Sequence, residues 1–345
     1  MTTFYLKKTS GRLPLRTTLS PGSGPVRRAF ARKYVLPLLL IQLAVLPALR
    51  VQAQSTYEPY SFTTFAGLPP GSADGTGSAA RFNSPAGVAV DSADNTYVAD
   101  TVNSTIRKIT PAGVVTTFAG LAGSTGSANG TGSAARFNGP VAVAIDNIGN
   151  IFVADTNNST IRKITPARVV STFAGLAGND GSANGTGSTA RFSFPSALAV
   201  DSANNIYVAD TSNSTIRKIT PARVVSTFAG LAGSPGSANG TGSAARFNFP
   251  SGVIVDRAGT GNIYVGDTSN FTIRQITPAG VVTTLAGSPG MRGGTNGTGS
   301  AARFELPEGM AVDSTGNIYV ADTDPSTIRK ITPGGAGEHF RRVIR

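Results

Sequence analysis

The sequence predicts an all-β fold, a β-propeller of five four-stranded antiparallel blades. The triplet Ala-Arg-Phe occurs five times, and successive copies lie 55, 55, 55 and 57 residues apart. The first four copies each contain four short runs rich in Val, Ile, Thr and Phe, separated by Gly, Pro, Asn and Asp, which is typical of strands and turns. A fixed period of this length indicates repeated units that bury their apolar faces against one another. The arginines of the triplet are Arg81, Arg136, Arg191, Arg246 and Arg303.

The second copy shows how one unit is built. Its four runs are Val141–Asp146, Ile151–Asp155, Thr160–Thr165 and Val169–Ala174. No run has the apolar period of a helix, and four antiparallel strands in each repeat are the pattern of a β-propeller. The small Ala and Val residues of the first run suit an innermost strand, where the blades converge. In the third run we expect the side chains of Arg162 and Lys163 to be exposed.

A phenylalanine follows the arginine of every triplet, just before the innermost strand. We expect these rings to pack between adjacent blades, and the loss of one ring to cost about 3–5 kcal/mol. They are Phe82, Phe137, Phe192, Phe247 and Phe304.

The two ends of the repeat region are incomplete in complementary ways. Ser61–Gly67 matches the fourth strand of a unit without the three strands before it. The last copy ends after its third run, Thr327–Thr332, and residues 334–345 depart from the repeat as an aberrant tail. We therefore predict that the N-terminal strand completes the last blade and removes exposed sheet edges. A six-bladed ring and a truncated longer array are the alternatives.

The first 53 residues have the features of a signal peptide. A basic region without acids precedes the apolar run Tyr34–Leu49, and Val51-Gln52-Ala53 supplies a cleavage site. The apolar run is shorter than the roughly 20 residues of a spanning helix, so we expect no stable membrane span after cleavage. Arg27 and Arg28 leave open the twin-arginine route beside the general secretory route. The mature propeller, residues 54–333, is thus expected in the periplasm, on the cell surface or outside the cell.

Charge and cysteine content exclude several function classes. The net charge of +12 is carried mainly by the leader: nine of the 30 Lys and Arg lie in residues 1–53, which leaves 21 against 18 acids, or +3. This value does not favour a nucleic-acid partner. The chain has no cysteine, which excludes disulfides, a thiol nucleophile and thiolate metal sites.

A longer motif surrounds the strand runs and resembles the NHL repeat. It reads Pro-x-Gly-Val-Ala-Val-Asp-x-x-x-Asn-x-Tyr-Val-Ala-Asp-Thr-x-Asn-x-x-Ile-Arg-Lys-Ile, and the linking segment Gly126–Phe137 looks like that of bacterial exported NHL propellers. The resemblance implies a β-propeller, more often six-bladed, that presents one face to a protein, RNA or another ligand. Some similar propellers are lyases that need histidines, and those positions cannot be matched here because His339, in the tail, is the single histidine. The five copies run from Pro85 to Ile109, Pro140 to Ile164, Pro195 to Ile219, Pro250 to Ile276 and Pro307 to Ile331.

Candidate ligand contacts are sought where the copies differ. The linking segments and the loops between the second and third strands should emerge on one face, where propellers commonly bind. Residues that are the same in every copy, such as the triplet arginines, are expected to serve the fold by bonding loop carbonyls or nearby aspartates such as Asp100 and Asp155. The predicted ligand-binding residues are Asn138, Ser193, Phe194, Asn248, Phe249, Glu305 and Glu308.

One aspartate ends the innermost strand of each copy. With carbonyl groups of the channel these carboxylates could hold Ca²⁺, but a carboxylate in this place more often caps the following turn. Capping is the favoured interpretation, Ca²⁺ is the alternative, and no other cofactor is predicted. The residues are Asp91, Asp146, Asp201, Asp256 and Asp313.

The sequence favours a non-enzymatic function. No histidine or asymmetric carboxylate cluster of the kind needed for acid–base catalysis stands out. We predict an exported binding or scaffold module that presents its long-loop face to a protein or glycan. The alternatives are a metal-dependent hydrolase or lyase with its site in the central channel, and a structural component of the cell envelope.

Overall fold

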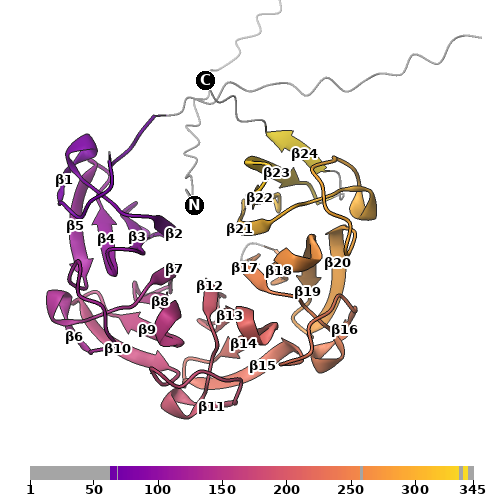
Figure 1. The fold of residues 1–345 in the computed structure, drawn as a ribbon, viewed down its shortest axis with the longest axis horizontal. Coiled ribbons are helices and arrows are strands. Elements are labelled where there is room, and N and C mark those ends of the chain that lie inside the picture. Colours follow the sequence, from indigo (N-terminus) through magenta and orange to yellow (C-terminus); the bar gives the residue numbers. More distant parts are fainter. Residues whose placement is uncertain (1–62, 68, 257–258, 334–336, 341–345) are drawn as a thin grey trace, which may run out of the picture. The chain divides into compact units, whose positions relative to one another are not determined.

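The computed structural model describes residues 63–67, 69–256, 259–333 and 337–340, and in them five antiparallel sheets form five blades (Figure 1). The predicted signal peptide lies outside the described residues. Blade 1 consists of β2 (Pro85–Val90), β3 (Thr96–Asp100), β4 (Thr105–Ile109), β5 (Val114–Ala119) and β1 (Gly75–Thr76). Blade 2 consists of β7 (Pro140–Ile145), β8 (Ile151–Asp155), β9 (Thr160–Ile164), β10 (Val169–Ala174) and β6 (Gly130–Thr131). Blade 3 consists of β12 (Pro195–Val200), β13 (Ile206–Asp210), β14 (Thr215–Ile219), β15 (Val224–Gly230) and β11 (Gly185–Thr186).

The last two blades differ in their outer strands. Blade 4 consists of β17 (Pro250–Val255), β18 (Ile263–Asp267), β19 (Thr272–Ile276), β20 (Val281–Gly287) and β16 (Gly240–Thr241). Blade 5 consists of β21 (Pro307–Val312), β22 (Ile318–Asp322), β23 (Thr327–Ile331) and β24 (Gly337–Phe340). In the described part of the chain, eight single-turn 3₁₀-helices occupy connections: Gly77–Ala79, Gly132–Ala134, Thr156–Asn158, Gly187–Thr189, Thr211–Asn213, Gly242–Ala244, Thr268–Asn270 and Gly299–Ala301. Within the described residues, no helix has the length and apolar character needed to cross a membrane.

The four predicted strands are confirmed in blades 1–4, and each of these blades adds a fifth. In these blades a Gly-Thr pair of the linking segment pairs with the fourth strand, as in Gly75↔Val115. The innermost strands β2, β7, β12, β17 and β21 contact one another in that order. They approach so closely that a Cβ added at Gly87 would lie 2.6 Å from the carbonyl oxygen of Val141. This crowding explains the small residues of the first run.

The hydrophobic core is divided among the blade interfaces. Phe137 of blade 2 is fully buried in a cluster with Ala119 of blade 1 and with Ile164 and Val170 of its own blade. Equivalent clusters form around Phe192, Phe247 and Phe304, which confirms the prediction that these rings pack between blades. Phe82 is only half-buried, because blade 1 has beside it only the short segment that includes Ala66.

The outer strand of blade 5 corrects the predicted ring closure. β24, which comes from the predicted aberrant tail, pairs with β23, and Thr63–Ala66 forms no strand. Ser61 and Phe62 lie outside the described residues. The peptide N–H of Gly67 donates to Gly77 O at 3.1 Å, as Gly120 does to Gly132 O, so this segment continues into blade 1 as a fourth strand continues into the following blade.

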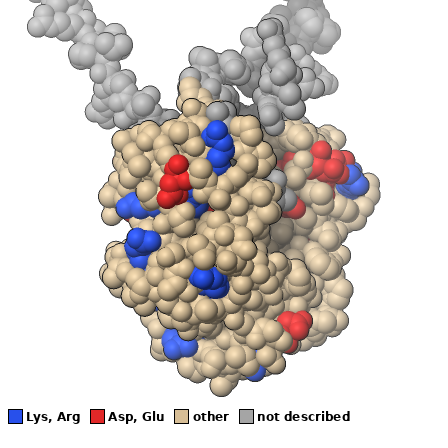
Figure 2. Space-filling view, turned by 60° about the vertical axis from the view of Figure 1, so that its left-hand side comes forward, with Lys and Arg blue, Asp and Glu red and all other residues tan. Residues whose placement is uncertain are grey.

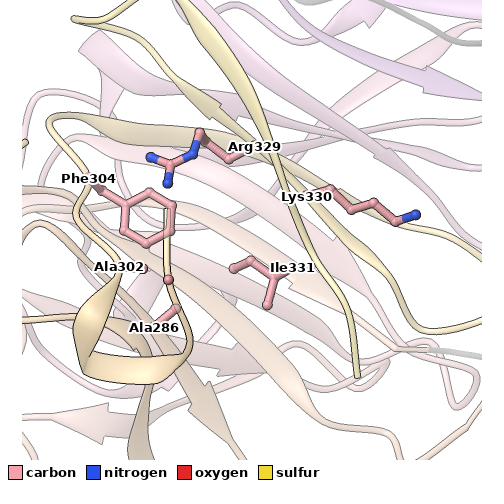
Figure 3. A pocket seen from close by; sticks show the side chains of 7 residues that line it. Ala286, Ala302, Phe304, Arg329, Lys330 and Ile331 are labelled. Carbon is pink, nitrogen blue, oxygen red and sulfur yellow. The ribbon is translucent and has the colours of Figure 1, made fainter. Parts of the chain in front are cut away.

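A small pocket marks the irregular outer part of blade 5 (Figure 3). It is a shallow hollow, partly open to solvent and too narrow to hold a water molecule, beside Phe304, Arg329 and Ile331. In blades 1–4 a buried valine faces the residue equivalent to Ile331, as in Val225↔Ile219, whereas in blade 5 Gly337 takes that register position. The pocket therefore lies where the other blades have a valine side chain.

We predict that Gly337→Val stabilises the protein by about 0.5–2 kcal/mol, because the added side chain would cover Ile331 as Val225 covers Ile219. The measurement is the free energy of unfolding in urea. The matched control, Val225→Ala, removes the equivalent contact in blade 3 and should cost about 2–3 kcal/mol. A destabilised Gly337→Val variant beside a destabilised control would contradict this account of the pocket.

Candidate binding face

One end of every sheet gathers the predicted ligand-binding residues. The start of each innermost strand pairs with the end of the second strand, as in Pro195↔Asp210. The residues that precede the innermost strand therefore lie beside the residues that follow the second strand. The peptide N–H of Ser212 donates to Ser193 O at 3.1 Å and joins the two segments. We call this surface the loop face; it comprises residues 83–84, 138–139, 193–194, 248–249 and 305–306 with the loops 101–104, 156–159, 211–214, 268–271 and 323–326.

A buried ion pair lies directly beneath the loop face in each blade. In blade 3, Arg217 Nη1 lies 2.9 Å from Asp210 Oδ2, and both side chains are fully buried. Asn213 Nδ2 donates to the same carboxylate oxygen, while Oδ1 accepts the peptide N–H of Ser193 at 2.7 Å. The other pairs are Asp100–Arg107, Asp155–Arg162, Asp267–Arg274 and Asp322–Arg329.

The same guanidinium also fixes the linking segment. Arg217 donates to the carbonyl oxygens of Arg191 and Ala183 and to Asn184 Oδ1, and its Cζ lies 5.2 Å from the centre of the Phe192 ring. These charge-assisted bonds hold the segment before the innermost strand against the blade. The loop face is therefore anchored from below in the same way in every blade.

One sequence expectation about arginine is wrong and another is confirmed. Arg162 is fully buried rather than exposed, because it is the partner of Asp155. The triplet arginine does bond loop carbonyls as predicted, since Arg136 Nη1 donates to Ser133 O and Ala135 O. The aspartate, however, pairs with the arginine of the third strand and not with that of the triplet.

The anchored segments carry different side chains in different blades. Phe194 and Phe249 are about half exposed (53% and 51%), and their φ angles of 52° and 50° lie in the left-handed region. Ser193 is nearly buried, and its Oγ donates to Asp180 Oδ2 at 3.3 Å. The equivalent amide of Asn138 accepts from Asn157 Nδ2 at 3.4 Å. The peptide N–H of Asn248 is held by Asp267 Oδ1.

Blade 5 makes its part of the loop face acidic. Arg292 forms ion pairs with Glu305 and Asp324 at the surface. Thr323 Oγ1 donates to Glu308 Oε2 at 2.8 Å, and burial raises the pKa of Glu308 above its ordinary value. On the side drawn in Figure 2, charged side chains are scattered and form no continuous patch of either sign.

The aspartates considered for Ca²⁺ lie at the opposite end of the sheets, each at its own turn. Asp91 Oδ1 accepts the peptide N–H groups of Ala93 and Asn95 at 2.9 Å, and Asn95 Nδ2 donates to both carboxylate oxygens. Asp146, Asp201 and Asp313 cap their turns in the same way, and Asp256 binds the amides of Gly259 and Thr260. These carboxylates do not converge, and the described ranges contain no group of three or more acidic or histidine side chains placed to hold a metal.

Comparison with known proteins relates the chain to one repeat family. Residues 82–109, 137–164, 192–219 and 304–331 match the NHL repeat. The chain is 30% identical over 276 residues to Protein SUPPRESSOR OF QUENCHING 1 of Arabidopsis thaliana and 30% identical over 298 residues to NHL repeat-containing protein 2 of Bos taurus. Each alignment covers 75% of this chain, but the chain spans only 26% and 40% of these relatives.

Solved structures share the fold at low sequence identity. An auxiliary nutrient binding protein from Bacteroides thetaiotaomicron has a TM-score of 0.56 at 16% identity, over 76% of this chain and 61% of that chain. A gluconolactonase from Xanthomonas campestris has a TM-score of 0.51 at 13% identity, over 75% of this chain and 76% of that chain. Likeness at these identities shows the fold alone.

Blade 5 lacks the asparagine that bonds the buried aspartate in the other blades, and restoring it tests what this asparagine contributes to stability. Asn213 donates both to Asp210 and to Gly181 O, whereas blade 5 has Pro325 in the equivalent position. We predict that Pro325→Asn stabilises the protein by about 1 kcal/mol, because new hydrogen bonds to a buried carboxylate and a carbonyl outweigh the lost rigidity of proline. Asn213→Ala should cost about 2 kcal/mol. Urea unfolding measures both, and an unchanged Pro325→Asn variant would show that blade 5 does not need this amide.

The aspartates beneath the loop face and those at the opposite end of the sheets should make protein stability depend on pH in opposite directions. Burial raises the pKa of Asp210 to about 6. Between about pH 4 and 6 the folded protein therefore binds a proton at Asp210 that the unfolded chain does not. The stability that this proton contributes is lost as the pH rises through that window. Burial, the largest single effect, would raise the pKa of Asp313, but the hydrogen bonds from Asn317 and Thr315 together outweigh it and lower this pKa. The contribution of Asp313 to stability is therefore lost as the pH falls below about 4. Asp210→Asn should flatten the first slope and Asp313→Asn the second. Urea unfolding midpoints from pH 3 to 7 measure these slopes, and an effect of Asp210→Asn confined to pH below 4 would contradict the assignment.

Proposed function

Because this chain is an NHL-repeat β-propeller, we propose that it is an exported, non-enzymatic binding module that presents its loop face to a ligand. The observation that carries this proposal is a contrast within the loop face. The anchoring ion pairs repeat in all five blades, whereas the exposed side chains above them change from blade to blade. The repeated ion pairs are needed to form each blade. The side chains that differ between blades are not needed for the fold, and contact with a ligand would explain their differences.

The site chemistry favours binding over catalysis. The enzymatic alternative, a metal-dependent hydrolase or lyase in the channel, needs carboxylates that converge on a metal. The inner-strand aspartates instead bind the amides of their own turns, as Asp91 does. Solved structures of similar fold include both a nutrient binding protein and a gluconolactonase, so the fold by itself does not decide between these candidates. The structural envelope component is the third candidate, which would bind neighbours without a discrete ligand.

Site-specific photo-crosslinking tests which face binds. The chain lacks cysteine, so Ser212→Cys on the loop face and Ser92→Cys on the opposite face each give one attachment point for a benzophenone maleimide. We expect irradiation with the envelope fraction of the source organism to give adducts from Ser212→Cys and not from Ser92→Cys. Adducts from the opposite face alone, or a melting temperature that rises with Ca²⁺ and falls back with EDTA, would favour the other candidates.

A further inference from the structure

Phe194, Phe249 and Phe271 of the loop face have a left-handed backbone that is unfavourable for a bulky residue, and of these three Phe194 and Phe249 are about half exposed. Phe194 and Phe249 each precede a proline, where an extended backbone is normal. Both have positive φ angles, which for a bulky residue cost roughly 1–3 kcal/mol. Half of each side chain remains exposed, so burial does not offset this strain.

The fold does not require phenylalanine at these positions. The equivalent residues of blades 1 and 2 are Ser84 and Gly139, with φ angles of 52° and 59°. The same left-handed turn therefore forms with small residues, and glycine adopts it without strain. Two strained, exposed rings on adjacent blades point to a role in contacting a ligand.

The surroundings of the two rings are polar but carry little charge. The exposed Ser212 and Ser269 follow the second strands of blades 3 and 4. Ser196 and Ser251 begin the innermost strands, where blades 1 and 2 have Ala86 and Val141, and their hydroxyls bond Thr211 and Thr268.

Charged groups near this part of the loop face are few. Asp180 is engaged by the hydroxyl of Ser193. The acidic residues Glu305 and Asp324 lie on blade 5 and share Arg292. No arginine or lysine occupies residues 193–196, 211–214, 248–251 or 268–271, so these segments offer an anion no positive charge.

We propose that Phe194 and Phe249 form a two-ring platform for a neutral glycan, an inference that rests on the proposed binding function. The negative face of an aromatic ring attracts the weakly positive C–H groups of a sugar ring. The serine hydroxyls and exposed backbone groups beside the rings can exchange hydrogen bonds with sugar hydroxyls. Equivalent positions on adjacent blades suit a chain of several sugar units rather than a single sugar.

A single introduced tryptophan reports directly on this platform. The chain has no tryptophan, so Phe249→Trp gives the full chain one fluorophore at the proposed site. We expect titration with one of the neutral hexasaccharides of glucose, mannose or xylose to shift its emission to shorter wavelength. Ile148→Trp is the matched control, because Ile148 is 73% exposed at a turn on the opposite face, and its emission should not change.

Replacement by glycine separates binding from folding. Phe194→Gly and Phe249→Gly should each weaken binding of the responding hexasaccharide at least ten-fold in calorimetry. The melting temperature should stay level or rise, because glycine relieves the left-handed strain. Ile148→Ser should leave the affinity unchanged. A ten-fold loss accompanied by a lower melting temperature in both variants would indicate a folding defect and overturn the platform.

The remaining outcomes distinguish this inference from the proposed function. Hexasaccharide binding that survives Phe194→Gly with Phe249→Gly would overturn the platform and leave the binding function standing. Crosslinks from Ser212→Cys to a protein, with no response to any hexasaccharide, would overturn the glycan and leave a protein ligand. No hexasaccharide response and no crosslink from the loop face would overturn both.

Discussion

The buried aspartate–arginine pair is the interaction on which the rest of the structure depends. In each blade it joins the end of the second strand, the third strand and the linking segment that enters the blade, as Asp210 and Arg217 do. Removal of two charges from water is costly, so such a pair contributes less to net stability than to the choice of one conformation. Here the chosen conformation is that of the loop face, because the carboxylate holds the peptide N–H that precedes the variable residue.

This anchoring divides the repeat into residues that serve the fold and residues that are free to vary. The aspartate, the arginine and the phenylalanine beneath it occur in all five blades. The position before the proline is occupied by Ser, Gly, Phe, Phe and Leu in turn, although four of these five share a left-handed backbone. Because the network below is the same, a change at this position alters the surface without altering the blade.

Much of the fold could be predicted from the sequence. The repeat period, the turn residues and the small residues of the innermost strand each indicate the same structure, a propeller of short antiparallel strands. The burial of Arg162 was missed because its strand carries two adjacent basic residues between two isoleucines, and an arginine is rarely fully buried unless it is paired. Asp155 and Arg162 recur seven residues apart in every copy, and an antiparallel hairpin brings such residues together, so a signal was present. The left-handed backbone of Phe194 could not be predicted, because proline normally imposes an extended conformation on its predecessor.

Blade 5 shows how the network adapts when no blade follows it among the described residues. In blades 1–4 a threonine hydroxyl donates to the proline carbonyl of the next blade, as Thr211 does to Pro250 O. In blade 5 Thr323 donates to the carboxylate of Glu308 instead. Pro325 and Gly337 replace the asparagine and valine of the other blades. Blade 5 therefore lacks the asparagine hydrogen bond to the buried aspartate and the valine contact with the third strand. It should open first in local unfolding, whereas the rings of Phe194 and Phe249 lie on blades whose repeated contacts are complete.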